Sequence, residues 1–358
     1  MIPYGRHSLD EHDIAAVTEV LRGPWLTQGP HVPAFEEALA AVTGASDAVV
    51  FSSGTAALHG AVAAAGVGPG DVVATSPLSF AASAACALYA GATPAFVDID
   101  PGTLCLDTTK VPPGIAAIVA VHYAGYPMDL DFGARRPPVV IEDAAHALGA
   151  TTPDGPVGNC ARSDMCVFSF HPVKAVTSAE GGAVTTNDAG LADRLRRFRN
   201  HGIVRHPENG GWCYEISDLG FNYRMTDIHA ALGTSQLNKL EAFVKRRNEL
   251  AGVYDAKLAE MPVRLPPAAP AGSRHAYHLY PVRVPDRRRV YEKLHESGIA
   301  AQVHYVPIYR HPLYVRFGRP SDFPATEAAY GELLSIPLYP DLTDDDHSCV
   351  VEALKAAL

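Results

Sequence analysis

The connection that decides the fold lies in residues 167–184, whose sequence is VFSFHPVKAVTSAEGGAV. It joins two short apolar runs, Met165–Ser169 and Ala183–Thr186, through a segment that holds one lysine, Lys174. Continuous apolar runs of this length are typical of strands that are buried on both faces of a sheet. The lysine therefore follows a buried strand and lies among aromatic and small residues rather than on a charged surface.

Similar runs occur throughout the first half of the chain. Besides the two runs above, the predicted strands are Asp47–Phe51, Asp71–Thr75, Pro94–Asp98, Ala116–His122 and Val139–Glu142. Alanine-rich helical stretches separate several of these runs. Strands that alternate with helices form a largely parallel sheet with helices on both sides, so the sequence predicts an α/β fold.

The second half has a different organisation. A helical apolar spacing runs from Thr226 to about Glu260 and predicts one long helix, and a proline-rich linker follows it at residues 262–272. Beyond the linker we expect a small α+β unit with strands at 277–284 and 301–306 and helices at 287–297 and from about 344. The sequence thus predicts a large domain, 1–240, and a small domain, 241–358, joined by the long helix.

The composition is that of an ordinary globular protein. Of its 358 residues 47% are hydrophobic and 19% charged, and 29 Lys and Arg against 39 Asp and Glu give a net charge of −10. An acidic chain lacks the basic surface that binds nucleic acids and anionic membranes, so we expect neither partner. The absence of a long apolar run and of a signal-peptide core predicts a cytoplasmic location.

Cysteine and histidine residues give no metal-binding pattern. The six cysteines include no CxxC pair, and the 16 histidines form no HExxH motif. A chain of this length needs no disulfide framework to hold its core together. We therefore expect reduced thiols and no metal.

A candidate phosphate site begins at the end of the first predicted strand. Residues 51–59, FSSGTAALH, join that strand to an alanine-rich helix. The N–H groups at a helix start, together with two hydroxyls, are suited to bind a phosphate. The alternative is ordinary capping of the helix by Ser53 or Thr55.

A candidate carboxylate site follows the strand at Val139–Glu142. Residues 141–149, IEDAAHALG, place Asp143 at a strand end, where ligands of open α/β sheets bind. A carboxylate in such a crevice is costly unless a cation pairs with it, so Asp143 favours a positively charged ligand group. The alternative is a helix cap.

Lys174 completes a set of groups that fits one cofactor. A lysine that burial desolvates has a lowered pKa and can form a Schiff base with an aldehyde. A phosphate site, a carboxylate for a pyridinium nitrogen and a lysine for an aldehyde together match pyridoxal phosphate (PLP). Phe80, which follows another predicted strand, could stack on the ring or be a plain core residue.

These motifs resemble those of the DegT/DnrJ/StrS family of PLP-dependent sugar aminotransferases, which share the aspartate aminotransferase fold, or fold type I. The resemblance covers nearly the whole chain, and its motifs are residues 25–30 (WLTQGP), 53–56 (SGTA), 142–147 (EDAAHA), 169–174 (SFHPVK), 180–182 (EGG) and 220–228 (GFNYRMTDI). Within the family, the chain is most similar to the branch that makes UDP-4-amino-4,6-dideoxy-N-acetyl-β-L-altrosamine for pseudaminic acid. The motifs that favour this branch are residues 171–174 (HPVK), 179–182 (AEGG) and 301–309 (AQVHYVPIY).

The resemblance implies a role for each candidate residue. Lys174 would carry the cofactor, Asp143 would face the pyridine nitrogen, His146 would lie near the ring hydroxyl and Phe80 would stack. The phosphate would be held by Gly54, Thr55 and Ser169, and by Asn222 of a neighbouring subunit, which implies a homodimer with shared active sites. Residues that align with the family's sugar pocket are Tyr4, Trp25, Leu26, Thr27, His304 and Tyr305.

The resemblance also implies the reaction, in which PLP, and its amino form PMP, carries an amino group from L-glutamate to a nucleotide-linked keto sugar. The expected acceptor is C4 of a UDP-4-keto-6-deoxy-N-acetylhexosamine. From the residues themselves, Arg205 is a candidate for the diphosphate, because a guanidinium matches phosphate oxygens, or else an exposed surface arginine. The alternatives are a dTDP-keto-sugar aminotransferase of antibiotic sugar biosynthesis, a PLP- or PMP-dependent sugar dehydratase and a PLP-binding regulator without turnover.

Overall fold

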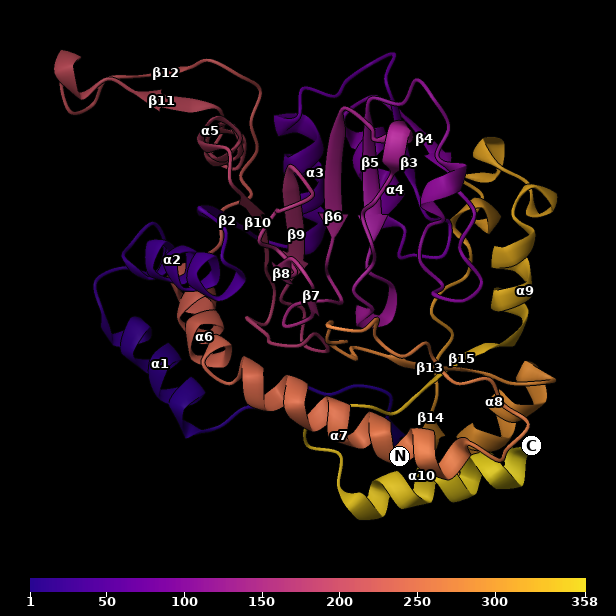
Figure 1. The fold of residues 1–358 in the computed structure, drawn as a ribbon. Coiled ribbons are helices and arrows are strands. Elements are labelled where there is room, and N and C mark those ends of the chain that lie inside the picture. Colours follow the sequence, from indigo (N-terminus) through magenta and orange to yellow (C-terminus); the bar gives the residue numbers. More distant parts are fainter.

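A seven-stranded sheet at the centre of the molecule gathers the apolar runs of the first half of the chain (Figure 1). The computed structural model describes residues 1–358. From one edge to the other, the strands are β2 (Asp47–Phe51), β10 (Gly182–Thr186), β9 (Met165–Ser169), β6 (Val139–Asp143), β5 (Ala117–Val121), β3 (Val72–Thr75) and β4 (Thr93–Phe96). Strand β10 is antiparallel to both of its neighbours, and the other neighbouring pairs are parallel. The predicted α/β class and the mostly parallel sheet are therefore confirmed.

Helices cover both faces of this sheet, which explains why its strands are apolar without interruption. On one face pack α3 (Gly54–Ala64), α4 (Ala82–Tyr89) and α5 (Ala189–Phe198), and on the other pack α2 (His31–Thr43) and α6 (Asp227–Leu237). Strand β2 shows the alternation, because Val49 and Phe51 enter the first core while Ala48 and Val50 enter the second. Residues on both faces of such a strand are thus removed from water.

The single long helix predicted from Thr226 to Glu260 is wrong, because two helices replace it. Helix α6 ends at Leu237, and α7 (Leu240–Leu258) begins after two polar residues, Asn238 and Lys239. Contacts with the N-terminal segment hold this junction: the Lys239 ammonium lies 2.5 Å from an Asp13 carboxylate oxygen, and the Gln236 amide donates to the same oxygen. Figure 1 shows α7 leaving the end of α6 and running below the sheet toward α10 (Asp344–Ala357), whereas α1 (Glu11–Arg22) stays beside α6.

The C-terminal part contains a small antiparallel pair, β13 (Tyr280–Arg283) and β15 (Leu333–Ile336), with α8 (Arg287–Glu296) and α9 (Pro324–Glu332). The predicted strand at 301–306 is wrong. The strand formed instead, β14 (Ile299–Ala300), pairs with β1 (Ile2–Pro3), and the chain then turns so that its aromatic side chains enter a cavity beside the large sheet. The division into domains 1–240 and 241–358 stays a prediction.

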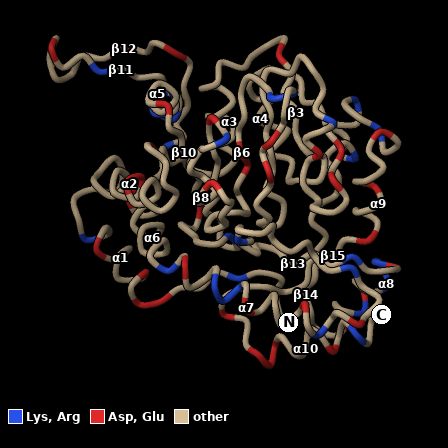
Figure 2. Tube along the Cα trace, viewed as in Figure 1, with Lys and Arg blue, Asp and Glu red and all other residues tan.

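Two short hairpins complete the fold. Strands β7 (Thr151–Thr152) and β8 (Gly155–Pro156) form one, and β11 (Ile203–Arg205) and β12 (Tyr214–Ile216) form another that projects from the body beyond α5 (Figure 1). Acidic and basic residues are spread over the helices and loops around the sheet (Figure 2). None of the helices combines the length and the apolar character needed to span a membrane.

Candidate active site

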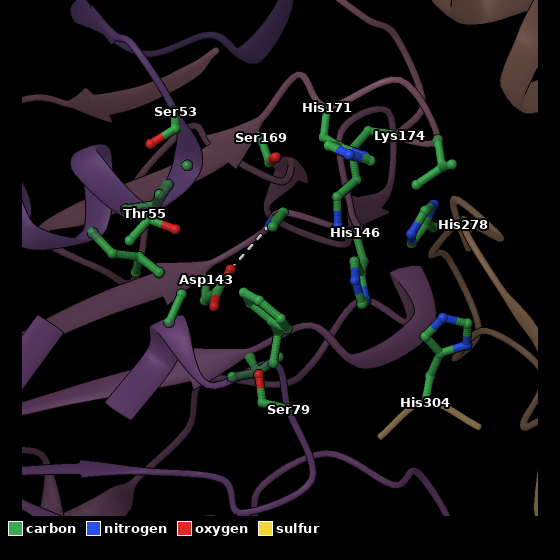
Figure 3. A pocket seen from close by; sticks show the side chains of 18 of the residues that line it. Ser53, Thr55, Ser79, Asp143, His146, Ser169, His171, Lys174, His278 and His304 are labelled. Atoms are coloured by element: carbon green, nitrogen blue, oxygen red, sulfur yellow. Dashed lines mark hydrogen bonds between the residues drawn. The ribbon is translucent and has the colours of Figure 1, made fainter. Parts of the chain in front are cut away.

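Most of the predicted site residues line one cavity of about 320 Å³ beside the central sheet. The cavity lies where β6 and β9 end, at Asp143 and Ser169, because the carboxyl ends of neighbouring parallel strands meet at one edge of a sheet. The predicted residues that it brings together are Tyr4, Gly54, Thr55, Phe80, Asp143, His146, Ser169, Lys174, His304 and Tyr305. Figure 3 shows how the polar side chains among them converge.

Lys174 is held in this cavity by a compact loop after β9. Its N–H donates to the His171 carbonyl at 2.9 Å, and the carbonyl of Phe170 accepts from the N–H of Ser178 and the hydroxyl of Thr177. Burial lowers the pKa of the Lys174 amine from 10.5 to about 8, and the negative charge of Asp143 opposes that shift. A neutral, nucleophilic amine is therefore accessible near neutral pH.

Asp143 is a buried carboxylate that no lysine or arginine pairs. One of its oxygens accepts from the Ser83 hydroxyl at 2.7 Å and the other from the Ala145 N–H at 3.2 Å, and 6% of the residue is exposed. The helix-cap alternative does not apply, because Asp143 ends a strand and caps no helix. Since a buried carboxylate is costly without a cation, the geometry favours a positively charged ligand group beside it.

The start of α3 forms the candidate phosphate site. The Ser53 hydroxyl accepts from the Ala56 N–H at 3.1 Å, so Ser53 is the helix cap that the sequence offered as an alternative. The N–H groups of Gly54 and Thr55 have no partner within the protein. A Cβ on Gly54 would lie 3.0 Å from the Ser169 Cβ, which explains why glycine stands where α3 meets β9. The cap therefore leaves the candidate phosphate site available.

Histidines line the opposite side of the cavity. The His146 Nε2 lies 3.0 Å from the Tyr305 hydroxyl, and the His146 ring centroid lies 4.4 Å from that of His278. Burial, followed by the charge of Lys174, holds the pKa of His146 well below its ordinary value and lowers that of His304 to about 4. Burial likewise holds the pKa of His278 well below its ordinary value. These imidazoles are thus neutral, and the Nδ1 atoms of His146 and His278 have no hydrogen-bond partner.

Sequence reasoning missed some residues of the cavity. Among them are His278, Ser79 and Ser83: the first two line it, and Ser83 binds Asp143 from behind. His278 lay inside a predicted strand, so nothing in the sequence marked it. The two serines flank Phe80, and hydroxyls on either side of a candidate stacking residue were a usable signal.

Five predicted residues do not line this cavity, which we call the lysine cavity because Lys174 lies in its wall. They are Trp25, Leu26, Thr27, Arg205 and Asn222. Arg205 lies instead in a second cavity of about 370 Å³, together with Arg196, Arg197, Arg199 and Arg224. Thr27 forms a bridge with Thr226, and Asn222 forms one with Asn200, so their segments adjoin the second cavity. Trp25 and Leu26 are half-exposed, at 56% and 50%. The candidate residues of one chain therefore lie in two regions, the lysine cavity and the second cavity with the segments near it.

The lysine cavity fits the predicted cofactor. The free N–H groups of Gly54 and Thr55 suit a phosphate, and the buried, unpaired carboxylate of Asp143 suits a protonated ring nitrogen. The Lys174 amine suits an aldehyde, and the orphaned Nδ1 of His146 is free for a polar atom of the ring. Each of these groups lacks within the protein the partner that PLP offers.

Comparisons with known proteins agree with this fit. The model of the DegT/DnrJ/EryC1/StrS aminotransferase family matches residues 7–355. The spore coat polysaccharide biosynthesis protein SpsC of Bacillus subtilis (strain 168) is 38% identical, over 99% of this chain and 96% of SpsC. Helicobacter pylori PseC, an aminotransferase involved in the biosynthesis of pseudoaminic acid, has a TM-score of 0.92 at 31% identity, over 99% of this chain and 98% of PseC. The PMP form of Spr1654, a putative sugar aminotransferase of Streptococcus pneumoniae, has a TM-score of 0.93 at 28% identity, over 100% and 99% of the two chains.

Proposed function

The chain belongs to the DegT/DnrJ/EryC1/StrS aminotransferase family, whose members are PLP-dependent sugar aminotransferases, and from this we propose its substrates. The donor is L-glutamate, and the acceptor is C4 of a UDP-4-keto-6-deoxy-N-acetylhexosamine. The likeness to PseC supports the choice of acceptor. The observation that carries the amine chemistry is the partly buried Lys174, whose pKa is lowered to about 8, in one cavity with Asp143.

Bound PLP supplies an aldehyde that carries the amino group and a ring that withdraws electrons from the reacting carbon. The Lys174 amine would hold the cofactor through its aldehyde, and as a free amine Lys174 would move a proton at the reacting carbon. Its lowered pKa suits both tasks, because the neutral amine accepts a proton and the ammonium returns it near neutral pH. Asp143 keeps the ring nitrogen protonated rather than acting as an acid or base.

The other residues of the cavity bind and orient the cofactor and the sugar. Gly54, Thr55 and Ser169 hold the phosphate, Phe80 stacks on the ring and His146 bonds a ring oxygen. Tyr4, His304 and Tyr305 form the sugar side of the same cavity, in keeping with their place in its wall. Their aromatic faces and polar atoms are the mixture that sugar pockets use.

We further propose a homodimer in which a second copy of the chain supplies Asn222, Arg205 and the Trp25–Thr27 segment. Lys174 is the only lysine or arginine in the wall of the lysine cavity, so the diphosphate of a nucleotide sugar needs cations from elsewhere. The projecting hairpin and the segment after it expose Trp212, Tyr214, Ile216 and Leu219, and apolar surface of this kind marks an interface. A cytoplasmic location also belongs to the proposal, because all six cysteines are free thiols.

A panel of substrates tests the proposal. The enzyme is incubated with L-glutamate and with UDP- or dTDP-linked 3-keto and 4-keto sugars, and the release of 2-oxoglutarate is measured. We expect turnover with the UDP-linked 4-keto sugar. Turnover of dTDP-3-keto sugars alone would contradict the nucleotide and the C4 position and leave the aminotransferase activity standing.

A further inference from the structure

A chain of two serine hydroxyls leads from the cavity wall to the Asp143 carboxylate. The Ser79 hydroxyl lies 2.7 Å from that of Ser83, which lies 2.7 Å from an Asp143 oxygen. The serines are 4% and 1% exposed, so water does not compete for these bonds. Ser79 itself lines the cavity, beside Phe80.

The chemistry of the groups fixes the direction of these bonds. An ionised carboxylate only accepts, so the one hydroxyl proton of Ser83 is donated to Asp143. The Ser83 oxygen then accepts the proton of Ser79. The chain is therefore ordered, with Ser79 donating to Ser83 and Ser83 donating to Asp143.

This arrangement differs from the usual behaviour of a helical serine. Ser83 lies in the first turn of α4, and such side chains commonly bond back to a carbonyl of the preceding turn. The Ser83 hydroxyl instead contacts two side chains, one of them Asp143 on strand β6. A segment of five residues, 79–83, thus supplies both the wall residue Phe80 and the donor to Asp143.

We propose that Ser83, assisted by Ser79, is a positioning residue that sets the basicity and orientation of the Asp143 carboxylate toward the nitrogen of the cofactor ring. The inference rests on the role given to Asp143 in the proposed function. A hydrogen bond to the charged form of a carboxylate makes it a weaker base. The proton that Asp143 shares with the ring nitrogen therefore stays on the nitrogen, where it is needed to withdraw electrons.

The test uses holoenzyme reconstituted with PLP that carries ¹⁵N in its ring, because the ¹⁵N chemical shift reports where this proton lies. The variants are Ser83→Ala, Ser83→Thr, Ser79→Ala and Asp143→Asn. Ser163→Ala is the matched control, because the Ser163 hydroxyl bonds the neighbouring carboxylate, Glu142, at 2.5 Å and lies outside the lysine cavity. The rate of amine transfer from glutamate is measured in single turnovers alongside.

In wild type we expect the resonance of a protonated ring nitrogen. Ser83→Ala is expected to shift it toward the unprotonated position and to slow amine transfer about tenfold, the effect of losing one bond to a charged group. Ser83→Thr keeps a hydroxyl and restores both, Ser79→Ala gives a smaller shift in the same direction, and Ser163→Ala shows none. Circular dichroism confirms that each variant is folded.

Two outcomes overturn different claims. If Asp143→Asn moves the resonance and Ser83→Ala does not, the serine chain has no effect on Asp143, and this inference alone fails. If Asp143→Asn leaves the resonance of the protonated nitrogen in place, the role of Asp143 in the proposed function fails, and the inference falls with it.

Discussion

The lysine cavity and the second cavity, which we call the arginine-lined cavity, are formed by different parts of the fold. The first is formed where strands end, and it gathers Asp143 and Ser169 from neighbouring strands of one sheet and Lys174 from the loop after β9. The second is formed by α5, β11, the start of α2 and the loops before α2 and α6, at the side of the molecule from which the β11–β12 hairpin projects. Only Lys174 is cationic in the first, whereas five arginines line the second.

The difference indicates which ligand groups each cavity can bind without the other. The lysine cavity has the groups for a phosphate, a pyridinium and an aldehyde and lacks fixed cations for a diphosphate. The arginine-lined cavity lacks a nucleophile, and three of its arginines, Arg196, Arg197 and Arg199, pair with carboxylates. The cations that it leaves without a carboxylate partner are Arg205 and Arg224. We infer that a nucleotide sugar needs both, supplied by two copies of the chain.

The largest expected effect comes from removing the amine of the lysine cavity. Lys174→Ala should lower the rate of amino transfer by about 10²–10⁴-fold or more, because positioned proton transfer contributes this much and the covalent attachment is lost as well. The protein should remain folded by circular dichroism. Lys110→Ala, at an exposed lysine that pairs with Asp107, serves as the control and should keep full activity. Activity of Lys174→Ala near that of wild type would contradict the assignment.

Mixing two inactive variants tests whether the regions act across a dimer. When Lys174→Ala and Asn222→Ala chains are unfolded together and refolded, half of the dimers should be hybrids, and each hybrid should hold one site with both residues intact. Activity should then rise to about a quarter of wild type. If Asn222 serves the site of its own chain, the mixture stays as inactive as its components.

The burial of Lys174 also predicts a dependence of stability on pH. In the cofactor-free protein, the folded state binds the lysine proton with a pKa of about 8 and the unfolded state with one of 10.5. The cost of burying the charge is therefore full below pH 8 and disappears as the pH rises to 10.5. Lys174→Met should raise the free energy of unfolding by roughly 3 kcal/mol below pH 8 and by little above pH 10.5. Urea unfolding across this range measures it, and an equal effect at both ends would show that the lysine is not desolvated.

The smallest expected effect concerns the arginine-lined cavity. Arg205→Ala should raise the KM for the nucleotide sugar about tenfold with little change in kcat, because it removes one charge-assisted contact to the diphosphate. Arg288→Ala is the control, since that arginine lies exposed on α8 and pairs only with Glu292. An unchanged KM for Arg205→Ala would place the diphosphate elsewhere.

Much of the fold was predictable because a local apolar run in the sequence marks each strand. Each of the seven apolar runs became a strand of the large sheet, since burial on both faces requires an unbroken apolar sequence. The break between α6 and α7 was not predictable, because it depends on contacts of Gln236 and Lys239 with Asp13, far away in the sequence. The run at 301–306 was misleading for a similar reason, as His304 and Tyr305 serve the cavity rather than a sheet.

The same distinction applies to the residues of the site: the sequence marks some of them locally, and distant contacts place the others. Residues at strand ends, such as Asp143 and Ser169, could be placed together from the sequence, because topology brings the ends of parallel strands to one edge. His278 could not, because the segment that carries it reaches the cavity only through the packing of the C-terminal part against the sheet. The sequence motif around Asn222 marked a residue without showing where it acts, which in our proposal depends on a second chain.

The most direct test of the account is to trap the cofactor on the chain. The holoenzyme is reduced with borohydride and digested, and its peptides are analysed by mass spectrometry, with Lys174→Ala treated in parallel. We expect the pyridoxyl mass on the peptide that contains Lys174 and on no other, and no label in the variant. A pyridoxyl group on a different lysine, or labelling that persists in Lys174→Ala, would contradict the claim that the lysine cavity is the cofactor site.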